Sequence, residues 1–341
     1  MLNLEGFLAD TQKLKHRIEN KDVDLIKAIQ RACQENLWFT EREINRMLHA
    51  ICSNYLDHDL LSQWLINVRP TFSQTTKTIA IISAGNIPLV SFHDILAVLG
   101  KGFVAQIKLS EKDKSLYFWL KSALESIHPK YKEQIVFTDK IKNYDAVIAT
   151  GNNLSANQFK HYFAHVPNLI RGHKNGIAVL HGNETVAHFN GLGTDIFSYY
   201  GLGCRNVSKI YVPENYSFTP LLKCFDENFG YVCQHAKYKN NYDYQLASCL
   251  MSPFTFLQSE TILLVQRNEI HSPLATLNFE YYTELDNLIS DLHNIREKVQ
   301  SVTSMHYLAT LKCIALGQTQ YPGLNDYADN IDTLEFLNQL S

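Results

Sequence analysis

The chain has 341 residues, and at roughly 150 residues per domain this length predicts about two domains. Hydrophobic residues make up 45% of the chain and charged residues 19%, which excludes an intrinsically disordered protein. The formal net charge is -3, so no strong positive field indicates binding to nucleic acid or to an anionic membrane surface.

The N-terminus, the hydropathy and the cysteines exclude further classes of protein. The first five residues lack a basic segment followed by an apolar run, so we expect no signal peptide and a cytoplasmic location. No stretch approaches the ~20 apolar residues of a membrane span. The seven scattered cysteines do not form a disulfide framework, and no CxxC or His–Cys cluster predicts zinc or another metal.

The first 70 residues are predicted to be helical. Apolar residues recur at helical spacing, and Thr40 followed by Glu43 is a capping-box pattern that begins one of these helices. From Thr78 onward, short β-branched runs alternate with amphipathic segments. We expect strands at 78–82, 104–108, 134–137, 146–149 and 176–180, and helices at 4–18, 23–33, 44–52, 91–99, 113–127 and 155–165.

A second set of alternating elements follows, with a boundary expected near residues 171–175. This alternation predicts βαβ units, and therefore parallel sheets covered on both faces. The fold class is accordingly α/β, in two halves that pack tightly. In the second half we expect strands at 208–212, 261–266 and 275–279, and helices at 184–200, 219–229, 242–251 and 282–299.

Cys204 is the most distinctive candidate for chemistry. It follows Gly201-Leu-Gly and precedes a predicted strand, which places the thiol in an accessible turn where its own N–H could point at a bound oxygen. Arg205 and Lys209 could stabilise the thiolate, which is the reactive form. The alternative is a small buried hydrophobic residue, which we favour for the other six cysteines, Cys33, Cys52, Cys224, Cys233, Cys249 and Cys313.

Three further stretches lie where predicted parallel strands end, the edge at which α/β proteins place their sites. The asparagine after strand 78–82 either donates its amide into a cavity or caps the next helix. Residues 108–111 could clasp a ribose or phosphate, or form a solvated strand end. Residues 150–152 could cover a cofactor or simply reverse the chain. The candidates are Asn86, Lys108, Ser110, Glu111, Thr150, Gly151 and Asn152.

In chain order, these stretches resemble motifs of the aldehyde dehydrogenase superfamily, and more closely its fatty acyl-CoA reductase branch, the family of the reductase subunit of bacterial luminescence. Asn86-Ile-Pro-Leu is similar to Asn-x-Pro-Leu, whose asparagine lines the oxyanion hole. Lys108-Leu-Ser-Glu111 is similar to the Lys-x-x-Glu that binds the adenosine ribose. Thr150-Gly-Asn152 is similar to the Thr-Gly-Ser turn beside the cofactor.

The resemblance continues through the second half. Gly201-Leu-Gly-Cys204 is similar to the nucleophile motif Gly-Gln-x-Cys, with the trailing Ser-Arg-x-x-Val strand matched at 208–212. Glu269-Ile-His-Ser-Pro is similar to Glu-x-Phe-Gly-Pro, whose glutamate holds the nicotinamide ribose. The resemblance implies an aldehyde-dehydrogenase-like fold: a helical N-terminal region and Rossmann-type cofactor domain over 1–174, a catalytic domain over 175–310, and a C-terminal segment over 311–341.

One departure implies a direction of reaction. Aldehyde-oxidising members carry Glu-Leu-Gly-Gly-Lys, whose glutamate activates the hydrolytic water, whereas the matching run at 170–174 has no carboxylate. The resemblance therefore implies a reductase that takes an acyl-CoA, with long chains favoured, to the aldehyde through acyl-Cys204, using NADPH, although NADH is also compatible. Alternatives are an NAD(P)-dependent aldehyde or semialdehyde dehydrogenase, a catalytically silent binding subunit, and a thioesterase-like acyltransferase.

Partners and two remaining stretches stay open at this stage. Besides the acyl-CoA substrate, an acyl-transferring partner protein and a homo-oligomer are both compatible with the resemblance, and we expect no nucleic acid. Arg171, His173 and Lys174 could lower the pKa of the Cys204 thiol, but we favour a basic surface turn. The polar and acidic stretch 317–332 has no assigned chemistry; a subunit contact and a closing flap are both open.

Overall fold

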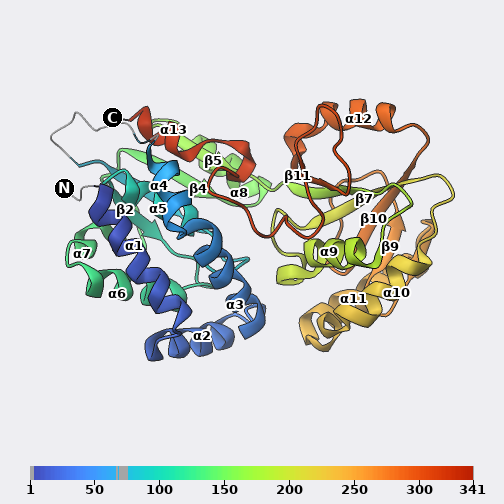
Figure 1. The fold of residues 1–341 in the computed structure, drawn as a ribbon, viewed down its shortest axis with the longest axis horizontal. Helices are drawn as coiled ribbons and strands as arrows, with labels where there is room; N and C mark the ends of the chain where they lie inside the picture. The colour runs from blue at the N-terminus through green and yellow to red at the C-terminus, as the bar shows by residue number, and fades with distance from the viewer. Residues whose placement is uncertain (1–3, 67, 69–75, 341) are drawn as a thin grey trace. The chain divides into compact units, whose positions relative to one another are not determined.

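The computed structural model describes residues 4–66, 68 and 76–340. Residues 1–3, 67 and 69–75, on which the expected absence of a signal peptide and the end of the helical region partly rest, lie outside this range. The chain divides into two compact units, described separately here: unit 1 is Met1–His173 with Pro322–Ser341, and unit 2 is Lys174–Tyr321. The C-terminal segment expected at 311–341 is thus split, because its last part returns to unit 1 (Figure 1).

Unit 1 is built on a five-stranded parallel sheet, whose central strands are apolar and largely buried. The strand order is β3-β2-β1-β4-β5, so the chain runs outward from β1 in one direction and resumes on the other side of β1. In open α/β sheets, ligands bind at this switch point, beyond the carboxyl ends of the strands. The strands are β1 (Thr78–Ile82), β2 (Val104–Lys108), β3 (Ile135–Phe137), β4 (Ala146–Thr150) and β5 (Asn168–Arg171).

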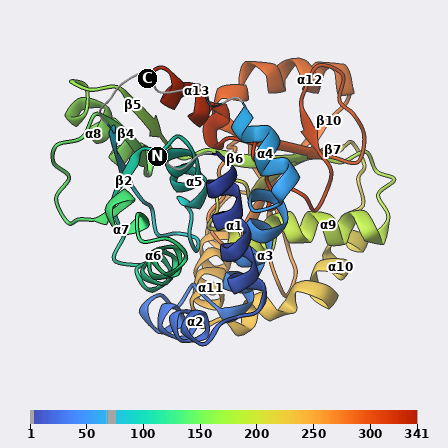
Figure 2. The ribbon, with the colours of Figure 1, turned by 60° about the vertical axis from the view of Figure 1, so that its left-hand side comes forward.

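Helices cover both faces of the unit 1 sheet. Ile79 and Ile81 lie in a large core with the N-terminal helices, of which α1 and α4 lie side by side (Figure 2). Ala80 and Val147 face the opposite side and pack against Phe163, at the end of α8. The helices are α1 (Leu4–Glu19), α2 (Val23–Glu35), α3 (Glu41–Ala50), η1 (Ile51–Tyr55), α4 (His58–Ile66), α5 (Phe92–Gly100), α6 (Ser115–Ile127), α7 (Tyr131–Gln134), α8 (Asn153–Tyr162), η5 (Ala328–Asn330) and α13 (Thr333–Asn338).

The C-terminal segment is fixed to unit 1 by a buried ion pair. Arg171, at the end of β5, is only 3% exposed and donates to Asp94 of α5 at 2.6 Å. Its second nitrogen donates to the Thr333 hydroxyl at 2.8 Å, which ties α13 to the sheet. The predicted basic surface turn is therefore wrong for Arg171, although His173 is exposed and Lys174 partly exposed.

Unit 2 contains a seven-stranded sheet in the order β12-β11-β6-β7-β10-β9-β8. Every neighbouring pair is parallel except β8 and β9, which form an antiparallel edge. Two parallel sheets with covering helices confirm the predicted α/β fold class. The strands are β6 (Asn175–Val179), β7 (Val207–Pro213), β8 (Phe256–Gln258), β9 (Leu263–Gln266), β10 (Thr276–Tyr282), β11 (Val299–Ser304) and β12 (Cys313–Ile314).

The helices of unit 2 connect these strands. Two of them pack closely because Gly193 leaves room for the Phe229 ring; a Cβ at this glycine would lie 2.2 Å from a ring carbon. No helix in the part of the chain that the structure describes combines the length and the apolar character needed to cross a bilayer. The helices are α9 (Val186–Phe197), η2 (Ser198–Gly201), α10 (Thr219–Phe229), η3 (Gly230–Gln234), α11 (Ala236–Leu250), α12 (Leu285–Asn294) and η4 (Arg296–Lys298).

Candidate active site

The carboxyl edge of the unit 1 sheet collects three of the predicted stretches. The strand register pairs Ile82 of β1 with Lys108 of β2 and with Ala149 of β4, so the three strands end at one level. Because these strands are parallel, the loops that follow them emerge side by side at the switch point. The structure therefore brings Asn86, the 108–111 stretch and the 150–152 turn to the same edge.

The Asn86 loop is held in place by Asp113, just before α6, and is not the N-cap of the helix that follows it. Asn86 is exposed, and α5 begins only at Phe92 with Ser91 at its N-cap, so the interpretation of Asn86 as a helix cap is wrong. Leu89 adopts a φ of 49°, in the left-handed region that a bulky residue rarely occupies. Its N–H donates to the Asp113 carboxylate at 2.7 Å, which stabilises this turn.

Buried polar groups complete the support of this loop. The Tyr117 hydroxyl accepts from the Ser91 N–H at 3.0 Å and lies 3.1 Å from the Ser83 hydroxyl. Burial raises the pKa of Tyr117. Burial also raises the pKa of Asp113 to about 7, against the hydrogen bond from the Leu89 N–H and with a smaller contribution from Glu35. One Asp113 oxygen has no hydrogen-bond partner, which is consistent with a carboxyl group that protonates easily.

The 108–111 stretch presents polar groups at the same edge. Lys108 and Glu111 are both exposed, and Glu111 accepts a hydrogen bond from Lys114 at 2.7 Å. Ser110 contacts the Asn86 loop instead, because a Cβ at Gly85 would lie 2.4 Å from the Ser110 hydroxyl oxygen. Lys108 and Glu111 are thus exposed at this edge, whereas the Ser110 side chain packs against the Asn86 loop.

The 150–152 turn begins helix α8. The Asn152 side chain accepts from the Ser155 N–H at 2.8 Å, so this asparagine is a helix N-cap. Gly151 packs against the first turn of α8, where a Cβ would lie 2.9 Å from the Ser155 Cβ. Because α8 follows β4 directly, its N-terminus and that helix end's partial positive charge lie at the carboxyl edge, as a pyrophosphate group requires.

These features fit a nicotinamide dinucleotide. The sheet supplies a switch point, a helix N-terminus, an exposed lysine and an exposed glutamate on one loop, and a glycine whose backbone lies against the Ser110 side chain of that loop. In contrast, no part of the described ranges gathers three or more His, Cys, Asp or Glu residues that could hold a metal ion.

Cys204 lies in a short turn between α9 and β7 of unit 2. It is a partly exposed thiol outside any disulfide. Tyr199, Tyr200 and Gly201 before it all have a positive φ, of 51°, 56° and 81°. After it comes Asn206, a buried side chain that binds backbone groups before Cys204: the Ser198 carbonyl and the Gly203 N–H. Sequence reasoning missed Asn206, because a hydrogen-bonded buried asparagine leaves no periodic signal.

Lys209 has a different role from the predicted one. It is 1% exposed, and its ammonium group donates to Glu280 of β10 at 2.5 Å and to the Asn268 carbonyl at 2.7 Å. The expectation that Lys209 stabilises the Cys204 thiolate is therefore wrong, because Glu280 neutralises its charge. Arg205 is partly exposed.

The loop that carries Glu269 is fixed by side chains of the sheet beneath it. Besides the bond from Lys209 to the carbonyl of residue 268, Asn278 donates to the carbonyls of residues 269 and 271, at 2.9 and 3.0 Å. Ser208 donates to the carbonyl of residue 270 at 2.7 Å. Four consecutive carbonyls are thus bound, and the exposed Glu269 side chain projects from a rigid backbone.

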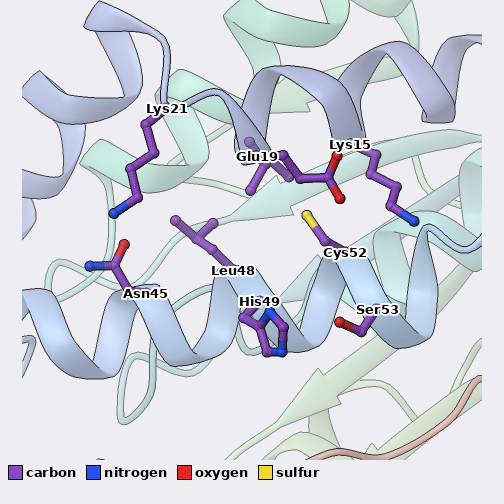
Figure 3. A pocket seen from close by; sticks show the side chains of 9 residues that line it. Lys15, Glu19, Lys21, Asn45, Leu48, His49, Cys52 and Ser53 are labelled. Carbon is purple, nitrogen blue, oxygen red and sulfur yellow. The ribbon is translucent and has the colours of Figure 1, made fainter.

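Of the other six cysteines, which were predicted to be buried, Cys52, Cys224 and Cys249 are buried, whereas Cys33, Cys233 and Cys313 are partly exposed. Burial raises the pKa of all of them, and raises that of Cys52 to about 12. Figure 3 shows Cys52 beside a pocket of about 330 Å³, with Glu19 and Lys15 of α1 across it. The thiolate is the reactive form, so a raised pKa makes each of these thiols a poor nucleophile at neutral pH.

The structure shows what surrounds residues 170–174, the stretch that has no carboxylate in the sequence. Ile170 packs with Ala80 and Val147 in the apolar cluster on one face of the sheet. However, Asp329 of the C-terminal segment accepts a hydrogen bond from the Gly172 N–H at 3.3 Å. A carboxylate therefore reaches this turn from a distant part of the chain, which the local motif could not indicate.

Comparison with known proteins identifies the fold. No family model and no curated protein matches this sequence. Aldehyde dehydrogenase 21 from Physcomitrella patens, solved with the reaction product succinate, aligns with 99% of this chain and 84% of its own, at a TM-score of 0.70 and 9% identity. An NAD-dependent aldehyde dehydrogenase from Sinorhizobium meliloti aligns over 89% and 70%, at 0.65 and 11% identity.

A third structure, AldH of Staphylococcus aureus in a substrate-bound state, aligns with 89% of this chain and 76% of its own, at a TM-score of 0.59 and 15% identity. These identities are low, so the comparisons establish the architecture. The chain has an aldehyde-dehydrogenase-like α/β fold.

Proposed function

We propose that this protein is a nicotinamide-dependent oxidoreductase that forms a covalent acyl intermediate on Cys204. The Cys204 turn carries the proposal: it presents a partly exposed thiol on a rigid backbone, within an aldehyde-dehydrogenase-like fold. The other cysteines have raised pKa values, which makes each of them a poor nucleophile at neutral pH.

We assign the reaction to the reductive direction, from an acyl thioester to an aldehyde. An acyl-cysteine can be hydrolysed only if a base activates water. At 170–174 the chain has no carboxylate of its own, and Ile170 is packed among apolar residues. Without such a base, the acyl-cysteine persists until it is reduced, as an aldehyde-forming enzyme requires.

The residues divide the chemistry between them. The Cys204 thiolate attacks the thioester carbonyl, and the coenzyme A thiolate leaves without needing a strong acid. The Cys204 N–H donates to the oxyanion; one such donor typically lowers the barrier by about 3 kcal/mol. The resemblance assigns a second oxyanion donor to Asn86 and cofactor contacts to Lys108, Glu111 and Glu269. When bound, a reduced nicotinamide supplies the hydride that brings the acyl group to the aldehyde level.

The second candidate is oxidation of an aldehyde or semialdehyde. Two observations favour it: the similar structures are named as aldehyde dehydrogenases, one of them NAD-dependent, and the Asp329 carboxylate reaches the Gly172 turn. In this reaction a carboxylate activates the water that hydrolyses acyl-Cys204, and the Asp329→Asn variant tests whether Asp329 supplies it. For the reductive reaction, we also propose the substrate and the cofactor. The substrate is a long-chain acyl group carried by coenzyme A or by a carrier protein, and the cofactor is NADPH or NADH.

Product analysis distinguishes the two candidates. Purified protein is incubated with palmitoyl-CoA and NADPH or NADH, and separately with hexadecanal and NAD⁺ or NADP⁺, with Cys204→Ser as the matched control. We expect aldehyde from the first mixture and none from the control. Acid from the second mixture, lost in Asp329→Asn, would instead establish oxidation. No product in either mixture across short and long chains would contradict the proposal.

A further inference from the structure

The backbone before Cys204 needs external support. Tyr199 and Tyr200 both lie in the left-handed region, and Gly201 follows them with a φ of 81°. Two consecutive aromatic residues in this region are strongly disfavoured, because Cβ crowds the neighbouring carbonyl oxygen. Such backbone persists only where surrounding groups determine it, and it is concentrated at functional sites.

Asn206 supplies that support from the other side of the turn. It is 4% exposed, and its amide nitrogen donates to the carbonyls of Asp195, Ile196 and Ser198, at 3.0, 3.2 and 2.9 Å. These carbonyls lie at the end of α9, where helical partners run out. Its amide oxygen accepts from the Gly203 N–H at 2.8 Å. A single side chain thus joins the helix end to the residue before Cys204.

The helix end is itself anchored by the stretch for which the sequence suggests no chemistry. The Asp195 carboxylate is fully buried and accepts from the Gly317 N–H at 2.7 Å. It also accepts from the Thr319 N–H and hydroxyl, at 3.0 and 2.7 Å. Gly191 and Gly317 allow the two backbones to touch, since a Cβ at Gly317 would lie 2.9 Å from the Gly191 Cα. Residues 317–319 therefore hold the carbonyls to which Asn206 binds.

We propose that Asn206 is the positioning residue for the Cys204 nucleophile, a role that rests on the proposed function. It fixes the chain before and after the turn, and therefore the directions of the Cys204 thiol and N–H. Only a carboxamide suits the site, because the contacts require donors toward three carbonyls and an acceptor toward one N–H. Alanine offers neither, and a carboxylate sets oxygen against oxygen.

The experiment measures the turn and the chemistry independently. Hydrogen exchange of the peptide covering residues 199–206 reports the turn, and the rate of acylation of Cys204 by palmitoyl-CoA, followed by mass spectrometry, reports the chemistry. For Asn206→Ala we expect faster exchange in this peptide and acylation slower by roughly a hundredfold, the usual consequence of a misplacement near 1 Å. The control is Asn338→Ala, which removes a buried asparagine from unit 1, and it should change neither.

A second variant tests the positioning role of Asn206 if Asn206→Ala does not fold. Asn206→Asp keeps the shape and the acceptor toward Gly203, and its carboxyl group can donate to a carbonyl only while protonated. Its acylation rate relative to the wild type should therefore fall as pH rises. Acylation within twofold of the wild type in Asn206→Ala, or an unchanged pH profile in Asn206→Asp, would overturn the inference.

The failure of the proposed function has a different signature. In that case the wild type itself forms no acyl adduct, and the role of Asn206 is tested by the hydrogen-exchange measurement alone. Unchanged exchange in residues 199–206 of the variants would then overturn the positioning role, whereas faster exchange would show that Asn206 still holds the turn.

Discussion

The Asn86 loop of unit 1 and the Cys204 turn of unit 2 reach similar strained backbones by different means. Both contain non-glycine residues with positive φ, Leu89 in one and two tyrosines in the other. The first is held by a carboxyl group, Asp113, whose pKa lies near neutrality. The second is held by the carboxamide of Asn206, which does not titrate.

This difference indicates that the two regions respond differently to conditions. A loop held by a titratable group changes stability with pH, whereas a turn held by an amide keeps its geometry as the thiol ionises. A nucleophile that works as a thiolate needs such a pH-independent support. The comparison is therefore open to tests that change one region and leave the other intact.

Replacing the nucleophile has the largest expected effect. Cys204→Ser should lower turnover by roughly 10⁴-fold or more, because a serine hydroxyl without a neighbouring base is a far weaker nucleophile. The matched control is Cys313→Ser, which changes a thiol of raised pKa in the same unit and should keep wild-type turnover. Equal activity of Cys204→Ser and the wild type in steady-state assays would remove Cys204 from the mechanism.

Replacing the exposed asparagine of unit 1 should come next. If Asn86 has the oxyanion role that its resemblance to Asn-x-Pro-Leu implies, Asn86→Ala should slow acylation of Cys204 by about 10²–10³-fold, the usual effect of removing one oxyanion donor. Because Asn86 is exposed, its loss should change the free energy of unfolding by no more than about 0.5 kcal/mol. Rapid-quench acylation and urea unfolding check the two halves of this prediction. A stability loss as large as that of Asn206→Ala would make Asn86 structural.

Removing the buried lysine should have a smaller effect, confined to cofactor binding. Lys209→Met releases Glu280 and the Asn268 carbonyl, so the loop carrying Glu269 should loosen. We expect the KM for the nicotinamide cofactor to rise about tenfold, with a stability loss of about 1–3 kcal/mol from the unpartnered carbonyl and carboxylate. An unchanged KM, measured with the acyl substrate saturating, would show that Glu269 does not depend on this contact.

The last expected effect is on stability rather than on turnover, and it concerns pH and the Asn86 loop. The Asp113 carboxyl has a pKa of about 7 in the folded chain against 3.8 in the reference state, so the folded protein binds the extra proton between these values. Its contribution to stability is complete below pH ~4 and is lost as pH rises to ~7. Asp113→Asn cannot ionise and keeps an acceptor for the Leu89 N–H.

The stability of the wild type relative to Asp113→Asn should therefore decrease from pH 4 to 7, by at most about 1.4 kcal/mol per pH unit. Urea unfolding across this range measures the difference. Asn206→Ala, compared in the same way, should show a difference that does not vary with pH. A constant difference for Asp113→Asn would contradict the contrast between the two regions.

The sequence predicts the regular parts of this molecule well. Apolar, β-branched runs such as 78–82 and 104–108 coincide with central strands, and the hydroxyl of Thr40 caps α3 as its pattern indicates. Strand β11 was not predicted, because four of the six residues in the run Val-Gln-Ser-Val-Thr-Ser are polar. All six of its residues are nevertheless buried, and Thr303 satisfies its hydroxyl by donating to the Ile314 carbonyl.

Contacts between distant segments account for what the sequence did not indicate. In the sequence, Arg171 looks like part of a basic turn. In the structure it is buried and donates hydrogen bonds to Asp94 and Thr333. Likewise, Asn206 and Asp195 are ordinary polar residues until the fold places carbonyls and N–H groups around them. Motifs identify candidate groups that meet a ligand, whereas the groups that position them depend on tertiary structure.

The most direct test of the account is the intact mass of the protein after mixing with palmitoyl-CoA, first without and then with NADPH. We predict a gain of one acyl group, located on Cys204 by peptide mapping and absent from Cys204→Ser. Added NADPH should discharge the adduct as the aldehyde. Discharge as free acid would contradict the reductive direction, and the absence of any adduct on Cys204 would contradict the mechanism itself.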